Sequence, residues 1–268
     1  MNEFSIDREF GRVAFGADPA AYHAARPSYP AWVFDVLRER CGLAPGVATF
    51  EVGAGTGIAT RVLLELGASP LVAIEPDSRM AAFLRSTLAA ETLQVVPHTF
   101  EEAALETNSF DLGVCATAFH WLDEDLALIK VARLIRPGGW WAMVWNIFGD
   151  DRRPDPFHDA TNGLLRGHSS PSDGRSGISF GLDFESRLAA LSLTGAFSNV
   201  EYFTSEWSLV LDPNQTVALY ATYSNVNIRD DRETVLAELG RVARDEFQGR
   251  VTRNMVTSLY IAQRCGAS

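Results

Sequence analysis

The stretch FEVGAGTGIAT, residues 50–60, carries three glycines at alternating positions, Gly53, Gly55 and Gly57, just after an acidic residue, Glu51. The residues before the glycines are β-branched and aromatic, and those after them have the apolar spacing of a helix. Glycines in such a strand-to-helix turn let a ligand approach the backbone N–H groups closely. Because a carboxylate beside the turn repels phosphate, the stretch favours a ligand that carries positive charge.

The residues around this stretch indicate the fold class. Short apolar runs alternate with helical patterns as far as Trp145, and this alternation predicts a parallel sheet covered on both faces. With two later strand-like runs, we expect an α/β, doubly wound, mostly parallel seven-stranded sheet, in which ligands bind beyond the carboxyl ends of the strands. The predicted strands are 47–52, 71–75, 93–96, 110–118, 140–145, 200–210 and 256–262. The predicted helices are 58–66, 77–90, 123–135, 155–166, 184–193, 212–224 and 232–247.

No linker separates two composition classes, so a single domain spanning residues 1–268 is expected. Within it we expect an N-terminal cap segment at 1–45, a ligand-binding core at 46–146, and substrate-side insertions with the last two strands at 147–268. The segment 167–181 is rich in Gly, Ser and Pro. It is interpreted as an exposed loop, with a mobile lid as the alternative.

Composition excludes several classes of function. The net charge of −11 disfavours a nucleic-acid partner, because phosphate binding requires a basic face. Three scattered cysteines form neither a disulfide framework nor a zinc motif, and no metal site is expected. No apolar run is long enough to span a membrane, and the first residues do not resemble a signal peptide, so a cytoplasmic protein is expected.

The glycine pattern departs from the dinucleotide fingerprint. The third fingerprint glycine would stand at position 58, where this chain has Ile58. A second acidic residue, Glu75, ends the next predicted strand, about where such folds hold a ribose. Two strand-end carboxylates suit a positively charged nucleoside. A purely structural turn, an NAD-type oxidoreductase and a non-catalytic cofactor-binding module remain the alternatives.

Four motifs, in order, resemble those of class I S-adenosylmethionine-dependent methyltransferases: EVGAGTG, AIEPD, FDLGVCATAFHWLD and LIRPGGWW, between Val47 and Trp145. The segment YHAARPSYP, residues 22–30, is similar to the small-molecule branch that includes trans-aconitate methyltransferase-like proteins and the ubiquinone-biosynthesis type. The resemblance implies S-adenosyl-L-methionine as the cofactor and a small-molecule acceptor. By analogy it favours O-methylation, of a carboxylate among other oxygens, over C-methylation.

The resemblance also assigns roles by position. The glycine turn would line the methionyl part of the cofactor, Glu75 would hold the ribose hydroxyls, and an N-terminal segment would fold over the cofactor. The residues of the turn are Glu51, Gly53, Ala54, Gly55 and Gly57, and those of the N-terminal segment are Tyr22 and Arg26. Pro76 and Met80 would pack near the ribose and adenine, where Thr99, Phe100 and Glu101 replace a common Asp-Ala-Glu segment. Thr117 and Ala118 would face the sulfonium.

His120, just past the fourth predicted strand, is the catalytic candidate. It is expected to act as a base or as a hydrogen-bonding group for the substrate; the alternative is packing against Trp121. The motif AFHW around His120 replaces the Asn/Asp-Pro-Pro-Tyr motif of amino-directed enzymes, which argues against DNA and protein-glutamine substrates. An anionic substrate would call for a cationic clamp from Arg152, Arg153 or Arg166, the alternative being solvated surface charge.

Overall fold

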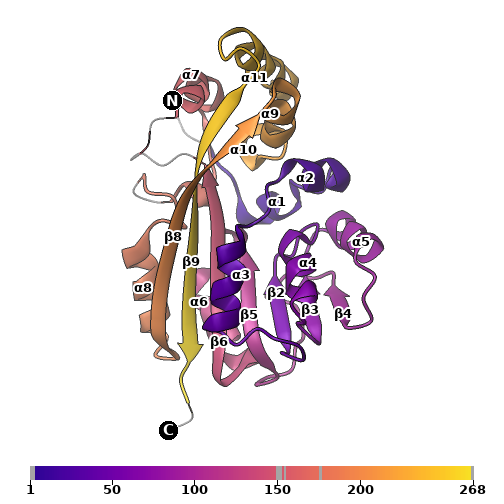
Figure 1. Cartoon of the computed structure of the whole chain (residues 1–268), viewed down its shortest axis with the longest axis vertical. Helices are drawn as coiled ribbons and strands as arrows, with labels where there is room; N and C mark the ends of the chain where they lie inside the picture. Colours follow the sequence, from indigo (N-terminus) through magenta and orange to yellow (C-terminus); the bar gives the residue numbers. More distant parts are fainter. Residues whose placement is uncertain (1–3, 149–152, 154, 175–176, 267–268) are drawn as a thin grey trace.

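The computed structural model describes residues 4–148, 153, 155–174 and 177–266. Within these residues, one sheet of seven strands has the order β4-β3-β2-β5-β6-β9-β8. All neighbouring strands are parallel except that β9 runs antiparallel to both β6 and β8. The predicted fold class is therefore confirmed (Figure 1). The strands are β2 (Thr49–Val52), β3 (Leu71–Ile74), β4 (Leu93–Val96), β5 (Phe110–Ala116), β6 (Ile135–Phe148), β8 (Phe197–Leu211) and β9 (Val251–Arg264).

Three strands are longer than their apolar runs predicted. β6 begins before Pro137-Gly138-Gly139, where a turn was expected, because Ile135 already pairs with Phe110 of β5. β8 and β9 stay paired as far as Leu211 and Val251. Because β8 is an edge strand, many of its side chains are half-exposed or exposed, so hydrophobicity alone understated its length.

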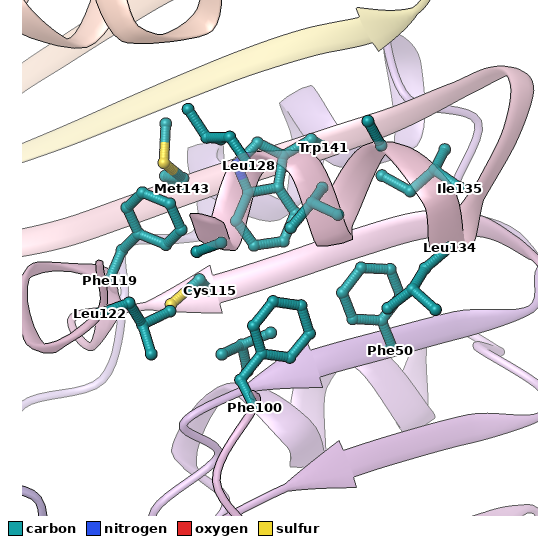
Figure 2. Close-up of a cluster of buried hydrophobic side chains, with 14 of the residues drawn as sticks. Phe50, Phe100, Cys115, Phe119, Leu122, Leu128, Leu134, Ile135, Trp141 and Met143 are labelled. Atoms are coloured by element: carbon teal, nitrogen blue, oxygen red, sulfur yellow. The ribbon is translucent and has the colours of Figure 1, made fainter. Parts of the chain in front are cut away.

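Helices cover both faces of the sheet. On one face, α3 (Ala31–Glu39), α4 (Ile58–Glu65) and α5 (Ser78–Thr87) pack against apolar side chains of the strands. On the other face, α6 (Glu124–Leu134) and α8 (Phe184–Leu193) enclose the largest core cluster. Figure 2 shows part of this cluster, including Phe50, Trp141 and Met143 around α6. Asp77 and Asp123 are the N-caps of α5 and α6, and their side chains accept backbone N–H hydrogen bonds.

A second group of helices lies beyond the carboxyl end of β6 (Figure 1). It is called the cap from here on, and it is distinct from the N-terminal cap segment expected at residues 1–45. Its own apolar cluster includes Phe157, Leu219 and Leu239. The helix predicted at 212–224 ends at Tyr220, because a tight turn follows at residues 221–223, and a separate short helix begins at Ser224. The cap helices are α7 (Pro156–Leu165), α9 (Pro213–Tyr220), α10 (Ser224–Asn227) and α11 (Arg232–Asp245).

The N-terminal segment reaches the same end of the molecule. It comprises β1 (Phe4–Ser5), α1 (Arg8–Val13) and α2 (Pro19–Ala25). β1 pairs with β7 (His168–Ser169), inside the segment predicted as an exposed loop. That prediction is wrong for much of the described segment, because backbone pairing and a short 3-10 helix, η2 (Pro171–Asp173), hold it against the protein, half-buried.

Candidate functional site

A cavity of about 1360 Å³ opens beyond the carboxyl ends of β2, β3, β5 and β6 and extends to the cap. Sites for a single small molecule usually enclose about 300–1000 Å³, so the volume suffices for two ligands. The structure brings fourteen of the sixteen predicted site residues to its wall: Tyr22, Arg26, Glu51, Gly53, Ala54, Gly55, Glu75, Pro76, Met80, Thr99, Phe100, Thr117, Ala118 and His120.

The other two predicted residues, Gly57 and Glu101, are not among the residues that line the cavity. Gly57 precedes α4 as its N-cap with φ +87°, and a Cβ there would lie 2.3 Å from Leu84, so its role is in the turn and its packing. Glu101 has an exposed side chain, and its carbonyl oxygen accepts a hydrogen bond from Lys130 Nζ at 3.1 Å.

The glycine turn places bare backbone at the base of the cavity. Gly53 and Gly55 have φ of +68° and +57°, in the left-handed region that favours glycine. A Cβ on Gly53 would lie 2.4 Å from the Cβ of Ala118, which follows β5. Two glycines are thus required by backbone conformation, and Gly53 is required also by the close approach of the two strand ends.

Glu75 connects the turn to the next strand. One carboxylate oxygen accepts a hydrogen bond from Gly55 N at 2.7 Å, and the other accepts one from Asp77 N at 2.9 Å. Burial raises the pKa of Glu75 to about 7, although both hydrogen bonds favour the ionised form. The sequence predicted a ligand-binding carboxylate here but not this support of the glycine turn.

Glu51 is the more deeply buried carboxylate. Thr60 Oγ1, from α4, donates to it a hydrogen bond of 2.6 Å. Burial, together with a smaller effect of the nearby Glu75, raises the pKa of Glu51 to about 8. Two buried acids with raised pKa values at one end of a cavity form an acidic site that is complementary to a cation.

These raised pKa values predict a pH-dependent stability. The folded protein retains protons on these two acids that the unfolded chain loses near pH 4.5, so their contribution to the free energy of unfolding should be greatest below that pH. It should fall by on the order of a few kcal/mol as pH rises to about 8. Urea denaturation of the ligand-free protein at pH 5 and pH 9 measures this loss. Glu51→Gln should remove much of it, and an equal loss in that variant would contradict the assignment.

His120 lies in η1 (Phe119–Trp121), buried just after β5. Its Nδ1 accepts a hydrogen bond of 3.1 Å from Trp145 Nε1, which can only donate. Burial, together with a smaller effect of the nearby Arg26, lowers the pKa of His120 to about 3, so the imidazole is neutral. Because Nδ1 accepts the hydrogen bond, the proton of the ring lies on Nε2. The ring also packs 5.2 Å from that of Trp121. This geometry favours a hydrogen-bond donor over a base.

Beside His120, a bend after β5 shapes the cavity wall. Thr117 has φ +54°, uncommon for a residue with a side chain. Its hydroxyl is 2.8 Å from the hydroxyl of Tyr29, a residue of the N-terminal segment that the sequence analysis did not single out. The motif around Tyr29, YHAARPSYP, was the available signal.

At the opposite side of the glycine turn, Phe100 is buried and Thr99 lies beside it. The Thr99 hydroxyl donates to Glu102 at 2.9 Å, so its side chain is engaged within its own loop. Lys130 of α6 donates to the carbonyl oxygens of Phe100 and Ala103 at 2.5 and 2.7 Å, which fixes this loop against the sheet.

The cationic residues of the cavity differ from the predicted clamp. Arg152 lies outside the described residues, Arg166 does not line the cavity, and Arg153 does. Arg26 also lines it, together with Arg253 of β9. Sequence reasoning missed Arg253, because it lies before the expected strand 256–262 and belongs to none of the motifs.

Two further features, metal ligation and membrane spans, concern the described residues only. Among them, no three His, Cys, Asp or Glu side chains are grouped as metal ligands. In the same part of the chain, every helix is too short or too polar to cross a membrane.

Comparison with known proteins places this cavity in context. A family described as "Methyltransferase domain" matches residues 50–143. An uncharacterized methyltransferase of Mycobacterium tuberculosis is 32% identical over 212 residues, covering 79% of this chain and 77% of that protein. An uncharacterized methyltransferase-like protein of Schizosaccharomyces pombe is 26% identical over 237 residues, covering 86% of each chain.

Solved structures share the fold at low identity. A protein of Anaeromyxobacter dehalogenans described as a type II methyltransferase has a TM-score of 0.62 at 22% identity, with 90% and 99% of the chains covered. A phosphoethanolamine N-methyltransferase of Haemonchus contortus has a TM-score of 0.58 at 13% identity, and this chain spans 57% of it. The [4+2]-cyclase SpnF has a TM-score of 0.58 at 13% identity over the whole of both chains. The fold alone therefore does not decide the reaction.

Proposed function

Since this chain belongs to the class I S-adenosylmethionine-dependent methyltransferases, an enzyme family whose cofactor is S-adenosylmethionine, we propose that it methylates a small molecule, at an oxygen atom, within the cavity. The observation that carries the proposal is the two-ended cavity. One end has the acidic glycine turn, and the other is walled by the cap and has room for a second ligand.

The residues at the glycine turn fit the cofactor. Buried Glu51 and Glu75 hold protons more tightly than free carboxylates do, and a bound sulfonium and ammonium would favour their ionised, negatively charged forms. Each oxygen of Glu75 accepts one backbone hydrogen bond and keeps a lone pair for a ribose hydroxyl. We assign the adenine end to Pro76, Met80, Thr99 and Phe100, and the cover over the cofactor to Tyr22 and Arg26. The Arg26 guanidinium also reaches the cap end, because it contacts the ring of Tyr223 as well as that of Tyr22.

When the acceptor oxygen is already ionised, as that of a carboxylate is at neutral pH, no proton has to be removed, and the protein needs only to position the two ligands. When bound, the cofactor supplies a methyl group on a positively charged sulfur, which leaves as a neutral thioether. We propose that Thr117 and Ala118 line the point where the two ligands meet. His120 would donate a hydrogen bond to the acceptor from Nε2, and the aromatic walls would exclude water.

This role for His120 predicts a specific pH profile. If His120 is neutral throughout, its titration should add no acidic limb near pH 6.5 to the dependence of kcat/KM on pH, unlike that of a general base. His120→Ala should lower kcat/KM by about fivefold, which corresponds to one hydrogen bond of about 1 kcal/mol. An acidic limb near pH 6.5 that His120→Ala removes would show that His120 acts as a base.

Labelled S-adenosylmethionine tests the proposed function. The protein is incubated with it and a low-mass extract of the source cells, and products are identified by mass spectrometry. Calorimetric binding of S-adenosylhomocysteine with labelled product supports the proposal. Binding without turnover would leave a cofactor-binding module, and binding of NAD instead would indicate an oxidoreductase.

The net charge and the cysteines bear on the partner and the compartment. The net charge of −11 supports a small molecule over a nucleic acid as partner. All three cysteines are unpaired, which is typical of a reducing compartment and supports a cytoplasmic protein.

A further inference from the structure

The cap end of the cavity contains two buried polar atoms whose hydrogen-bonding capacity is not used up within the protein. They are the hydroxyl of Tyr223, which directly precedes α10, and Nε of Arg26, which directly follows α2. Both residues line the cavity, and the Arg26 guanidinium lies over the Tyr223 ring, 5.1 Å from its centroid. Nε of Arg26 has no partner, and the Tyr223 hydroxyl accepts from Arg253 but keeps its own proton to donate. An unpaired buried donor costs about 1–3 kcal/mol, so two such donors at a cavity wall point to a ligand that accepts from both.

The charge at this end is positive. Arg26 Nη2 donates to the carbonyl oxygen of Thr222 at 3.0 Å, and none of the ion pairs found among the described residues involves Arg26. Arg253 is fully buried, and its Nε donates to Asp155 at 2.7 Å, so that charge is balanced. The guanidinium of Arg26 therefore adds one unbalanced positive charge.

Tyr223 lies within the influence of both arginines. Burial raises the pKa of its phenol, and Arg253 and Arg26 each oppose that rise. The ring is held by Phe148 and Tyr220, at centroid distances of 5.5 and 5.0 Å. The hydroxyl is thus a fixed donor beside two cations, an arrangement complementary to an oxyanion.

Arg253 is far from the glycine turn along the sheet. Val144 of β6 pairs with both Ala116, at the end of β5, and Leu259 of β9. Arg253 lies six residues before Leu259 in β9, or about 20 Å at the rise of an extended strand. Ala118 lies two residues beyond Ala116 in the same direction, so about four residues of strand, or about 13 Å, separate its level from that of Arg253. A ligand held near Arg253 and methylated beside Ala118 must therefore extend over roughly that distance.

We infer that the methyl acceptor is an elongated anion whose carboxylate, or similar oxyanion, is bound by the Tyr223 hydroxyl together with Arg26 and Arg253, and is not itself the methylated group. The inference rests on the proposed methyl transfer and adds the acceptor's chemical class. It also separates the anchoring group from the methylated oxygen.

Charge fractionation tests the class of acceptor. A low-mass extract of the source cells is separated on an anion exchanger at pH 7, and both fractions are incubated with the full-length protein and labelled S-adenosylmethionine. Label should enter compounds of the retained fraction, and the products should be retained again. Labelling of the unretained fraction alone, or products that no longer bind the exchanger, would overturn the inference. Labelling of neither fraction would refute the proposed function itself, and this inference with it.

The variant Tyr223→Phe tests the site. It removes one hydroxyl and keeps the ring, so KM for the retained acceptor should rise about 10–100-fold, as for a lost hydrogen bond to a charged group. Affinity for S-adenosylhomocysteine, measured by calorimetry, should not change. Tyr260→Phe is the matched control, because the Tyr260 hydroxyl donates to Gly181 O at 3.1 Å and is not part of the cavity wall. An unchanged KM in folded Tyr223→Phe would remove Tyr223 from acceptor binding and refute the assignment.

Discussion

Gly53→Ala should abolish measurable binding of S-adenosylhomocysteine and destabilise the protein. The left-handed φ of +68° costs an alanine about 1–2 kcal/mol. The new Cβ would also lie 2.4 Å from that of Ala118, so the turn or the end of β5 must move, and both line the cavity. Calorimetry measures the binding, and urea denaturation measures the stability.

Two further variants separate the cost of the left-handed φ from the cost of the clash with Ala118. Gly46→Ala carries the φ penalty alone, since φ is +90° and the space around its Cβ is open. It should lower stability without changing cofactor affinity. The double variant Gly53→Ala/Ala118→Gly removes the clash but keeps the φ penalty, and it should recover part of the binding. Full affinity in Gly53→Ala would show that the strand ends do not need to approach so closely.

Glu75→Ala should weaken binding of S-adenosylhomocysteine by about 1–3 kcal/mol, roughly 5–150-fold. The carboxylate would lose its proposed contact with the ribose, and Gly55 N would lose its acceptor at 2.7 Å. Part of the loss would therefore come from a less ordered glycine turn. Glu75→Gln retains one acceptor oxygen and should lose less.

Glu91→Ala is the control for the two variants of Glu75, because Glu91 is exposed and does not line the cavity. It should bind S-adenosylhomocysteine like the unaltered protein. If Glu75→Ala bound equally well, neither the ribose assignment nor the support of the turn would hold.

The core of the fold was predictable from sequence because its signals are local. Strands buried on both faces, such as Leu71–Ile74, are continuous apolar runs, and helices such as the one after Asp77 begin at capping residues. The position of β9 between β6 and β8 was not predictable, because pairing partners are chosen by the packing of the whole sheet. A different pairing, that of Ile135 with Phe110 of β5, extended β6 through Pro137-Gly138-Gly139, although these residue types are typical of a turn.

The site divides in the same way. Glu51, Gly53 and Glu75 belong to motifs whose spacing is fixed by one strand-to-helix turn, and the structure brings them together. Tyr223 and Arg253 come from segments 30 residues apart that meet only in the cap, so no spacing pattern marks them. The state of His120 depends on Trp145, a neighbour in space from another strand.

The pairing of Leu211 with Val251 has a consequence for how this enzyme family could change its substrates. Because these two residues are partners in the sheet, residues 212–250 leave the sheet and return to it at the same point, carrying α9, α10, α11 and Tyr223. This segment could be exchanged for that of a relative as one cassette without altering the strand register or the glycine turn. Acceptor selectivity would then be transferable between enzymes, while the methyl donor would stay the same.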